Sequence, residues 1–306
     1  MSKTPVIIDT DPGTDDAAAL GIALFSEELD VRLITTVGGN VSLDHVTDNV
    51  LKLLKFWNKK VPVARGATGP LVRGLVDASD VHGKSGLDGY VFAGRADACL
   101  LPDVAVDAAY KTIMGAREPM TLIAIGPLTN VALLLKVHPD VRGKISRIAL
   151  MGGALGRGNK GVLSEFNIAT DPEAASIVFS AGVPVTMVGL EIGNKAALSL
   201  EDVELMRRSG KTGKMLYSLF EGRLSRGVKR VLSMYDPTAV AYVTCPQMFK
   251  TVNTYVGVEL TGEFTAGSTL VDLDGLLGQD PNVTVCTDID SEAFRSWFLE
   301  SVAACG

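Results

Sequence analysis

The chain of 306 residues has few of the features that tie a protein to an oxidising compartment or a membrane. Its four cysteines are far apart and show no CxxC spacing, which favours free thiols in a reducing cytosol. No stretch approaches about 18 uninterrupted apolar residues, and the first apolar run is too short for a signal peptide. We therefore expect a cytoplasmic protein with no membrane partner.

Excess positive charge is also absent, since the net charge is −6 and the sequence pI is about 5.2. This balance gives no electrostatic reason to bind nucleic acid or an anionic membrane surface. The length and the 47% hydrophobic content suffice for one large α/β domain or two small ones. Because no internal repeat, low-complexity tract or Pro/Ser-rich linker interrupts the chain, we expect one domain over residues 1–306.

Short apolar runs alternate along the chain with segments of helical spacing. The runs that indicate buried strands end in glycine or polar residues; they are Val6–Ile8, Leu33–Val37, Val61–Val63, Leu122–Ile125, Ile148–Met151 and Val185–Val188. Helical spacing follows from about Asp15, over Asp44–Trp57 and over Leu128–Leu135. This alternation predicts an α/β fold with a mostly parallel central sheet flanked by helices, a Rossmann-like core. In such sheets ligands bind beyond the carboxyl ends of the strands.

Two further segments deviate from this alternation. From Phe249 on, β-like runs precede a closing helix that begins near Ser291, which predicts additional edge strands. Residues 65–99 are rich in Gly and Asp with little periodicity, so they are either disordered or a lid near the site.

The stretch Asp80–Gly86 is similar to a phosphate-binding P-loop. However, the first glycine that this motif requires is replaced by Ala78, and no predicted strand precedes the stretch, so we reject that interpretation.

Aspartates are concentrated where the first strand meets the first helix. Asp9, Asp11, Asp15 and Asp16 lie within eight residues, around a Pro12–Gly13 turn. Carboxylates this close repel one another, and a hard divalent cation that prefers oxygen ligands would compensate them. Helix capping accounts for one or two of the acids, but not for four. The cluster therefore predicts a metal site.

Two familiar metal-binding patterns fit this stretch poorly. An EF-hand loop that starts at Asp9 would need an acid at Gly13 and a glutamate at Leu20, so that interpretation fails. The haloacid dehalogenase-type phosphatases end a strand in DxDx followed by Thr or Val. Here Gly13 follows Asp9–Pro12, so a Mg²⁺-dependent phosphatase is the second hypothesis. A non-catalytic, calcium-stabilised binding protein is the third.

The string DTDPGTDD, residues Asp9–Asp16, resembles the signature of the inosine–uridine preferring nucleoside hydrolases. Six further blocks resemble that family in the same order: Val37–Asn40, Val81–Gly83, Ile125–Asn130, Met151–Ala154, Glu165–Asn167 and Asp236–Pro237. The chain is most similar to the bacterial broad-specificity branch. The resemblance implies Ca²⁺-dependent hydrolysis of the N-glycosidic bond of purine or pyrimidine ribonucleosides, which serves nucleoside salvage.

The resemblance also assigns roles to individual residues. It implies Asp11 as general base and calcium ligand, with Asp16, Asp236 and the backbone carbonyl of Ile125 as further Ca²⁺ ligands. Substrate contacts are implied for Asp15, Asn40, His82, Met151, Asn159, Glu165, Phe166 and Asn167. The transition state would be oxocarbenium-like, as in glycosidases. A homodimer or homotetramer is expected from relatives alone.

The residue before Asp236 departs from the family pattern. Many members have a histidine there as a candidate acid for the leaving base, whereas this chain has Tyr235. Tyrosine has an unperturbed pKa near 10, so it can donate a proton but is a different acid. His82, in the 65–99 segment, is expected on the base side as a second catalytic candidate. Basic residues on the preceding helix would add positive charge near the base or form a solvated face; they are Arg223, Arg226, Lys229 and Arg230.

Overall fold

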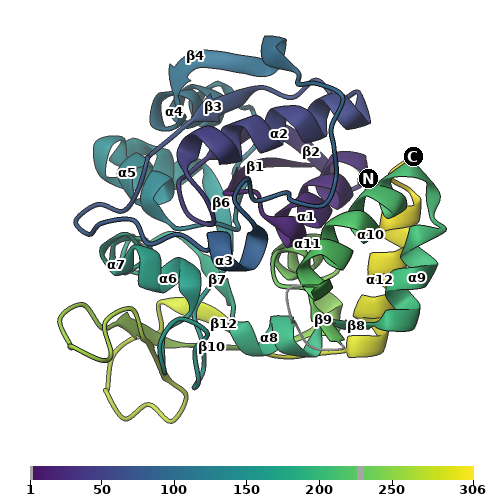
Figure 1. Ribbon diagram of the computed structural model, residues 1–306. Helices are drawn as coiled ribbons and strands as arrows, with labels where there is room; N and C mark the ends of the chain where they lie inside the picture. Colours follow the sequence, from purple (N-terminus) through teal and green to yellow (C-terminus); the bar gives the residue numbers. More distant parts are fainter. Residues whose placement is uncertain (1–2, 226–230) are drawn as a thin grey trace.

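The computed structural model describes residues 3–225 and 231–306 (Figure 1). Its main sheet has ten strands in the order β11-β10-β12-β7-β6-β5-β1-β2-β3-β4. Their bounds are β1 Thr4–Thr10, β2 Leu29–Thr36, β3 Val63–Arg65, β4 Leu100–Val104, β5 Met120–Ala124, β6 Ile145–Met151, β7 Val185–Val188, β10 Phe249–Val258, β11 Thr269–Asp272 and β12 Val283–Ile289. The short strands β8, Ala197–Ser199, and β9, Val231–Ser233, form a separate antiparallel pair.

Helices cover both faces of the main sheet. They are α1 Thr14–Phe25, α2 Leu43–Trp57, α3 Ser79–His82, α4 Ala105–Gly115, α5 Thr129–Val137, α6 Phe166–Thr170, α7 Pro172–Phe179, α8 Leu190–Lys195, α9 Leu200–Arg207, α10 Gly210–Ser225, α11 Asp236–Thr244 and α12 Ser291–Ala303. Side chains of β1 alternate between the faces, so Val6 and Ile8 enter one hydrophobic core and Ile7 the other. The first core lies under α1, α2 and α8–α12, and the second under α4, α5 and α7.

The sheet is parallel except for β10, which is antiparallel to its neighbours β11 and β12. This arrangement confirms the predicted α/β fold with a mostly parallel sheet. Strands β10 and β11 form one edge, as expected from the sequence after Phe249. Strand β12 instead lies inside the sheet, because it also pairs in parallel with β7.

The strands that follow β1 in the sequence lie on both sides of it in the sheet. Strands β2, β3 and β4 follow on one side of β1, and β5, β6 and β7 on the other. Asp9 of β1 is therefore in register with Thr35 of β2 and with Ala124 of β5. A crevice opens at such a switch point, beyond the carboxyl ends of the strands. The aspartates that follow β1 thus lie at its centre.

Several predicted boundaries shift by a few residues. The strand expected over Val61–Val63 is observed over Val63–Arg65, because Val63 pairs with both Ile34 and Leu100. Strand β2 begins at Leu29, four residues earlier than expected, since Leu29 pairs with Thr4. Apart from Arg65, which ends β3, residues 65–99 contain only short helices, as their lack of periodicity indicated. Among the described residues, no helix is both long and apolar enough to cross a bilayer.

Candidate active site

A cavity of about 360 Å³ opens at the switch point. Almost every residue predicted for the site lines it: Asp15, Asn40, His82, Ile125, Met151, Asn159, Glu165, Phe166, Asn167, Tyr235 and Asp236. The two exceptions, Asp11 and Asp16, are fully buried beside these residues. Residues predicted from blocks scattered over the whole chain are thus brought into one place.

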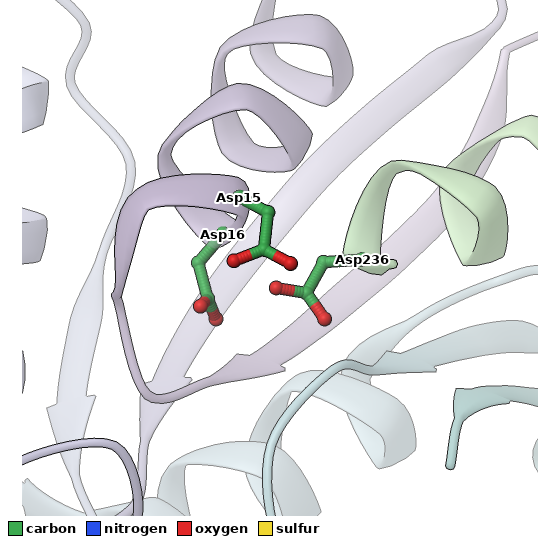
Figure 2. Close-up of side chains that lie close together, drawn as sticks. All are labelled: Asp15, Asp16 and Asp236. Carbon is green, nitrogen blue, oxygen red and sulfur yellow. The ribbon is translucent and has the colours of Figure 1, made fainter. Parts of the chain in front are cut away.

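The carboxylates of Asp15, Asp16 and Asp236 lie close together (Figure 2), and two of these residues, Asp15 and Asp236, line the cavity. Asp15 and Asp16 come from the first turn of α1, and Asp236 begins α11, which packs against α1. One carboxylate oxygen of each lies within 4.8 Å of the others. Asp15 therefore belongs to the acid cluster, and it also lines the cavity, so its implied substrate contact stays a prediction.

Burial and mutual repulsion both act on these acids. Burial and then the charges of Asp16, Asp15 and Asp11 raise the pKa of Asp236 well above its usual range. Burial and the neighbouring Asp15 raise the pKa of Asp16 to about 6. Such an arrangement is unfavourable for the protein alone, because each carboxylate loses hydration next to like charges. A divalent cation would relieve it.

Asp11 is enclosed by two glycine-containing turns. Its Oδ2 accepts the backbone N–H of Asn40 at 2.7 Å, and its buried Oδ1 has no hydrogen-bond partner among the described residues. A Cβ at Gly39 would overlap the carboxylate, and one at Gly126 would come within 2.7 Å of Oδ1. Burial, then the charge of Asp16, raises the pKa of Asp11 well above its usual range. One oxygen of Asp11 thus remains available to a ligand.

Asn40 joins two of the four acids of the N-terminal motif. Its Nδ2 donates to the carbonyl of Asp11 at 3.1 Å and to Oδ2 of Asp16 at 3.2 Å. Asp16 also accepts from Thr10 at 2.7 Å and from the N–H of Gly13 at 2.9 Å, so it caps α1 as well. Capping and membership of the acid cluster are therefore compatible functions of one carboxylate.

The opposite wall is built around α6. Oε2 of Glu165 accepts the N–H groups of Gly153 at 3.1 Å and Asn167 at 2.9 Å, and thereby caps the helix. Burial raises the pKa of Glu165 from 4.5 to about 7. Nδ2 of Asn167 donates to the carbonyl of Ile125 at 3.2 Å and to that of Met151 at 3.0 Å. The ends of β5 and β6 are joined in this way.

Asn159 belongs to the loop that precedes α6. Its Oδ1 accepts the N–H of Phe166 at 2.9 Å, which fixes the loop beside the cavity. Lys160 also lines the cavity and lies 5.4 Å above the ring of Phe166. Our sequence analysis did not identify Lys160, although its position next to Asn159 was a signal.

His82 is held over the N-terminus of α1. Only 8% of the residue is exposed, and its Nδ1 accepts the N–H of Thr14 at 3.3 Å. Its ring occupies the space that a Cβ on Gly13 would need. Part of the 65–99 segment therefore covers the site, in agreement with one of the two predicted alternatives.

Buried Asn49 on α2 fastens this covering loop, and the sequence analysis did not identify it. Its Nδ2 donates to the carbonyl of Pro12 at 3.0 Å and to that of Ser85 at 2.7 Å. Asn49 is 1% exposed. The sequence did carry a signal for it, because a polar residue on the apolar face of a predicted helix is unusual.

Tyr235 lies at the start of α11 and lines the cavity next to Asp236. Its hydroxyl donates to Oδ1 of Asn194 on α8 at 3.0 Å. The structure does not describe Arg226, Lys229 and Arg230, or the side chain of Arg223, so their predicted role near the base stays a prediction.

The donors around the acid cluster fit a hard cation. All of them are oxygens, from Asp15, Asp16, Asp236 and the unpartnered Oδ1 of Asp11, and no sulfur or imidazole joins them among the described residues. Oxygen-only sets suit Ca²⁺ or Mg²⁺. A doubly wound sheet with this acid cluster at its switch point could therefore hold a divalent ion where ligands of such folds bind.

The chain belongs to the inosine–uridine preferring nucleoside hydrolase family, whose model matches residues 6–296. It is 47% identical over 301 residues to the non-specific ribonucleoside hydrolase RihC of Klebsiella pneumoniae strain 342, covering 98% of this chain and 99% of the relative. It also resembles the solved plant nucleoside hydrolase PpNRh1, with a TM-score of 0.93, 31% identity and 99% of both chains covered.

A purine-preferring ribonucleoside hydrolase from Gardnerella vaginalis gives a TM-score of 0.90 at 27% identity, again over 99% of both chains. These likenesses decide against the dehalogenase-type phosphatase and the non-catalytic binding protein. The chain is an enzyme of the hydrolase class.

Proposed function

We propose that this enzyme hydrolyses the N-glycosidic bond of purine and pyrimidine ribonucleosides, giving ribose and a free base, with Ca²⁺ as its metal. The observation that carries the proposal is the buried acid cluster at the floor of the cavity, with Asp11 beside it. Broad base specificity is supported by the 47% identity to relatives named non-specific ribonucleoside hydrolases. Nucleoside salvage is the corresponding cellular role.

Asp11 would hold the ion together with Asp15, Asp16, Asp236 and the carbonyl of Ile125. When bound, the ion would lower the pKa of a water molecule and neutralise the carboxylates. Asp11 would accept the proton of that water, which is the role that resemblance to the family implies for it. The water then attacks the anomeric carbon of the ribosyl group.

Polar side chains around the cavity orient the sugar. Asn40, Asn159, Glu165 and Asn167 offer amide and carboxyl groups to the ribose hydroxyls, and Met151 and Phe166 offer apolar surface to the ring. Binding energy gained on the hydroxyls holds the anomeric carbon against the water, which lowers the activation barrier. A substrate without these hydroxyls leaves buried polar groups unpaired, so the site favours ribonucleosides.

His82 and Tyr235 face the leaving base in this proposal. Cleavage leaves negative charge on the base, and a proton from a nearby side chain neutralises it. Tyr235 has a hydroxyl to donate at the position where many relatives have histidine. His82 is held in the covering loop as a second contact to the base.

A small panel of substrates tests the proposal. The purified enzyme is incubated with inosine, uridine, nitrophenyl riboside and an aryl phosphate, with and without a chelator, and ribose and phosphate release are followed. Ribose release that stops on chelation and returns with Ca²⁺ is expected. Phosphate release, or ribose release that resists chelation in a protein free of metal, would contradict the proposal.

Location and assembly complete the proposal. Four free cysteines support a reducing cytoplasm, and size-exclusion chromatography with light scattering tests the predicted homodimer or homotetramer.

A further inference from the structure

Lys160 is the only lysine or arginine that lines the cavity among the described residues. Its Nζ lies over the ring of Phe166, 5.4 Å from the ring centre, and Phe166 lines the same cavity. Lys160 forms no salt bridge with a described carboxylate. An ammonium group over a ring keeps the N–H donors that point away from the ring available. It can therefore donate a hydrogen bond to a molecule bound in the cavity.

The backbone of Lys160 is held by a short hairpin. Its N–H donates to the carbonyl of Ser164 at 2.9 Å, and Gly158 lies so close to the backbone of Ser164 that a Cβ there would overlap it. Ser164 is bridged in turn to Ser268, and its hydroxyl donates to the carbonyl of Ala266 at 2.9 Å. The side chain of Lys160 therefore starts from a fixed position beside the cavity.

The structure of a ribonucleoside indicates which of its groups this ammonium would meet. The base is attached to C1′, and C4′ carries the 5′-hydroxyl on the other side of the ring oxygen. In the proposed function the base faces His82 and Tyr235, so the 5′-hydroxyl lies at the end of the sugar away from them. Lys160 contacts Phe166 of the α6 wall and follows Asn159, which is among the residues proposed to contact the ribose hydroxyls.

We propose that Lys160 is a specificity-determining residue that donates a hydrogen bond to the 5′-hydroxyl of the ribose, an inference that rests on the proposed function. The contact makes or breaks no covalent bond. It holds the C4′ end of the sugar while the C1′ end reacts, and binding energy on such a remote group orients the reacting carbon. A sugar without the 5′-hydroxyl loses the contact and is cleaved more slowly.

A substitution of Lys160 combined with a change in the substrate isolates the contact. Lys160→Met keeps an unbranched apolar stem but removes the N–H donors, and 5′-deoxyinosine lacks the acceptor. With Ca²⁺ present, kcat/KM for inosine should fall about tenfold or more in the variant, as expected for the loss of a hydrogen bond to a charged group. For 5′-deoxyinosine it should fall less than about twofold, because the partner is already missing. Uridine has the same sugar and should show the loss seen with inosine.

Two further variants test whether the charged donor is responsible. Lys160→Arg keeps positively charged N–H donors, so kcat/KM for inosine should stay within about threefold of the parent value. Arg157→Met is the matched control, because it removes a positive charge from the same loop. Arg157 is exposed and does not line the cavity, so this variant should cleave inosine and 5′-deoxyinosine as the parent does.

The outcomes are distinguishable. Losses in Lys160→Met that are large on inosine and uridine but small on 5′-deoxyinosine support the inference. Equal losses on inosine and 5′-deoxyinosine would overturn it, because Lys160 would then only support Phe166 or the hairpin. No loss on inosine, a loss confined to one base, or an arginine variant as impaired as the methionine variant would overturn it as well. If the parent enzyme releases no ribose from inosine, the proposed function fails instead.

Discussion

Two regions of the cavity differ in what holds their polar side chains. On the proposed ribose side, Asn40 and Asn167 bond to carbonyls at the ends of the strands, and Glu165 accepts from backbone N–H groups. On the proposed base side, Tyr235 donates to the exposed side chain of Asn194, and His82 belongs to a covering loop fastened by Asn49. The first region is fixed by the sheet, and the second by short helices and loops.

The difference teaches how one site can combine fixed chemistry with variable selectivity. In the proposed mechanism, the residues bonded to the sheet contact the sugar, which every ribonucleoside shares. In the same proposal, His82 of α3 and Tyr235 at the start of α11 contact the base, which differs between substrates. Changes on the ribose side should therefore affect all substrates alike, whereas changes on the base side should depend on the leaving group.

The largest expected effect is the loss of the general base. Asp11→Asn should lower kcat about 10⁴-fold on inosine, uridine and nitrophenyl riboside alike, because proton removal from water precedes every reaction. Asp9→Asn is the matched control, since Asp9 contacts Thr35 and Asn130 and does not line the cavity. If the loss of activity caused by Asp11→Asn differed between leaving groups, the division of the cavity into a ribose side and a base side would be wrong.

The next effect concerns the sugar rather than the protein. We expect 2′-deoxyinosine to be cleaved at least about 10³-fold more slowly than inosine, because its missing hydroxyl leaves buried polar groups unpaired. Values of kcat/KM for matched ribo- and deoxyribonucleosides measure this ratio. The ratio should be similar for purines and pyrimidines, and a ratio that varies with the base would contradict the division between the two sides.

Glu165 should make stability depend on pH. Its folded-state pKa of about 7 exceeds the ordinary 4.5, so between these values the folded protein holds a proton that the unfolded chain releases. The free energy of unfolding therefore falls as pH rises through this window, by about 3 kcal/mol for this group.

Glu165→Gln removes that contribution. Urea titrations of parent and variant at pH 4.5 and 7.5, in chelator, should show a difference in unfolding free energy that changes by about 3 kcal/mol between the two pH values. Other buried acids titrate in both proteins and cancel. A difference that stays constant with pH would show that Glu165 is ionised throughout.

The smallest expected effect lies on the base side. Tyr235→Phe should slow inosine and uridine about tenfold and nitrophenyl riboside hardly at all, because only the nucleosides need a proton on the leaving group. Steady-state kinetics on the three substrates measure the split. Equal losses would place Tyr235 with the residues that act on the sugar.

The same division describes what the sequence could predict. Asp11 and Asp16 stood out because four acids within eight residues need compensation, and strand-ending glycines marked the carboxyl edge of the sheet. Asp236 is more than 200 residues away, and only family resemblance connected it to them. The sequence alone could not show that Asp15 lies beside Asp236, because that contact depends on how α11 packs against α1.

The base side was less accessible to such reasoning. Helix α8 has six residues, too few for a periodic pattern. Nothing in the sequence therefore connects Asn194 with Tyr235, although the two side chains are hydrogen-bonded. Asn49 was hidden within a helix that was correctly predicted for its apolar residues. Contacts between short elements distant in sequence leave no local signal.

The packing of α11 against α1 also bears on how the molecule is made. A nascent chain of 200 residues already contains β1 and α1, but it lacks the carboxylate of Asp236. During synthesis the early aspartates would thus be an incomplete set of the ligands proposed for the ion, and tight binding would require the later docking of α11 against α1. A prematurely terminated fragment would then lack one of the carboxylates proposed to hold the ion.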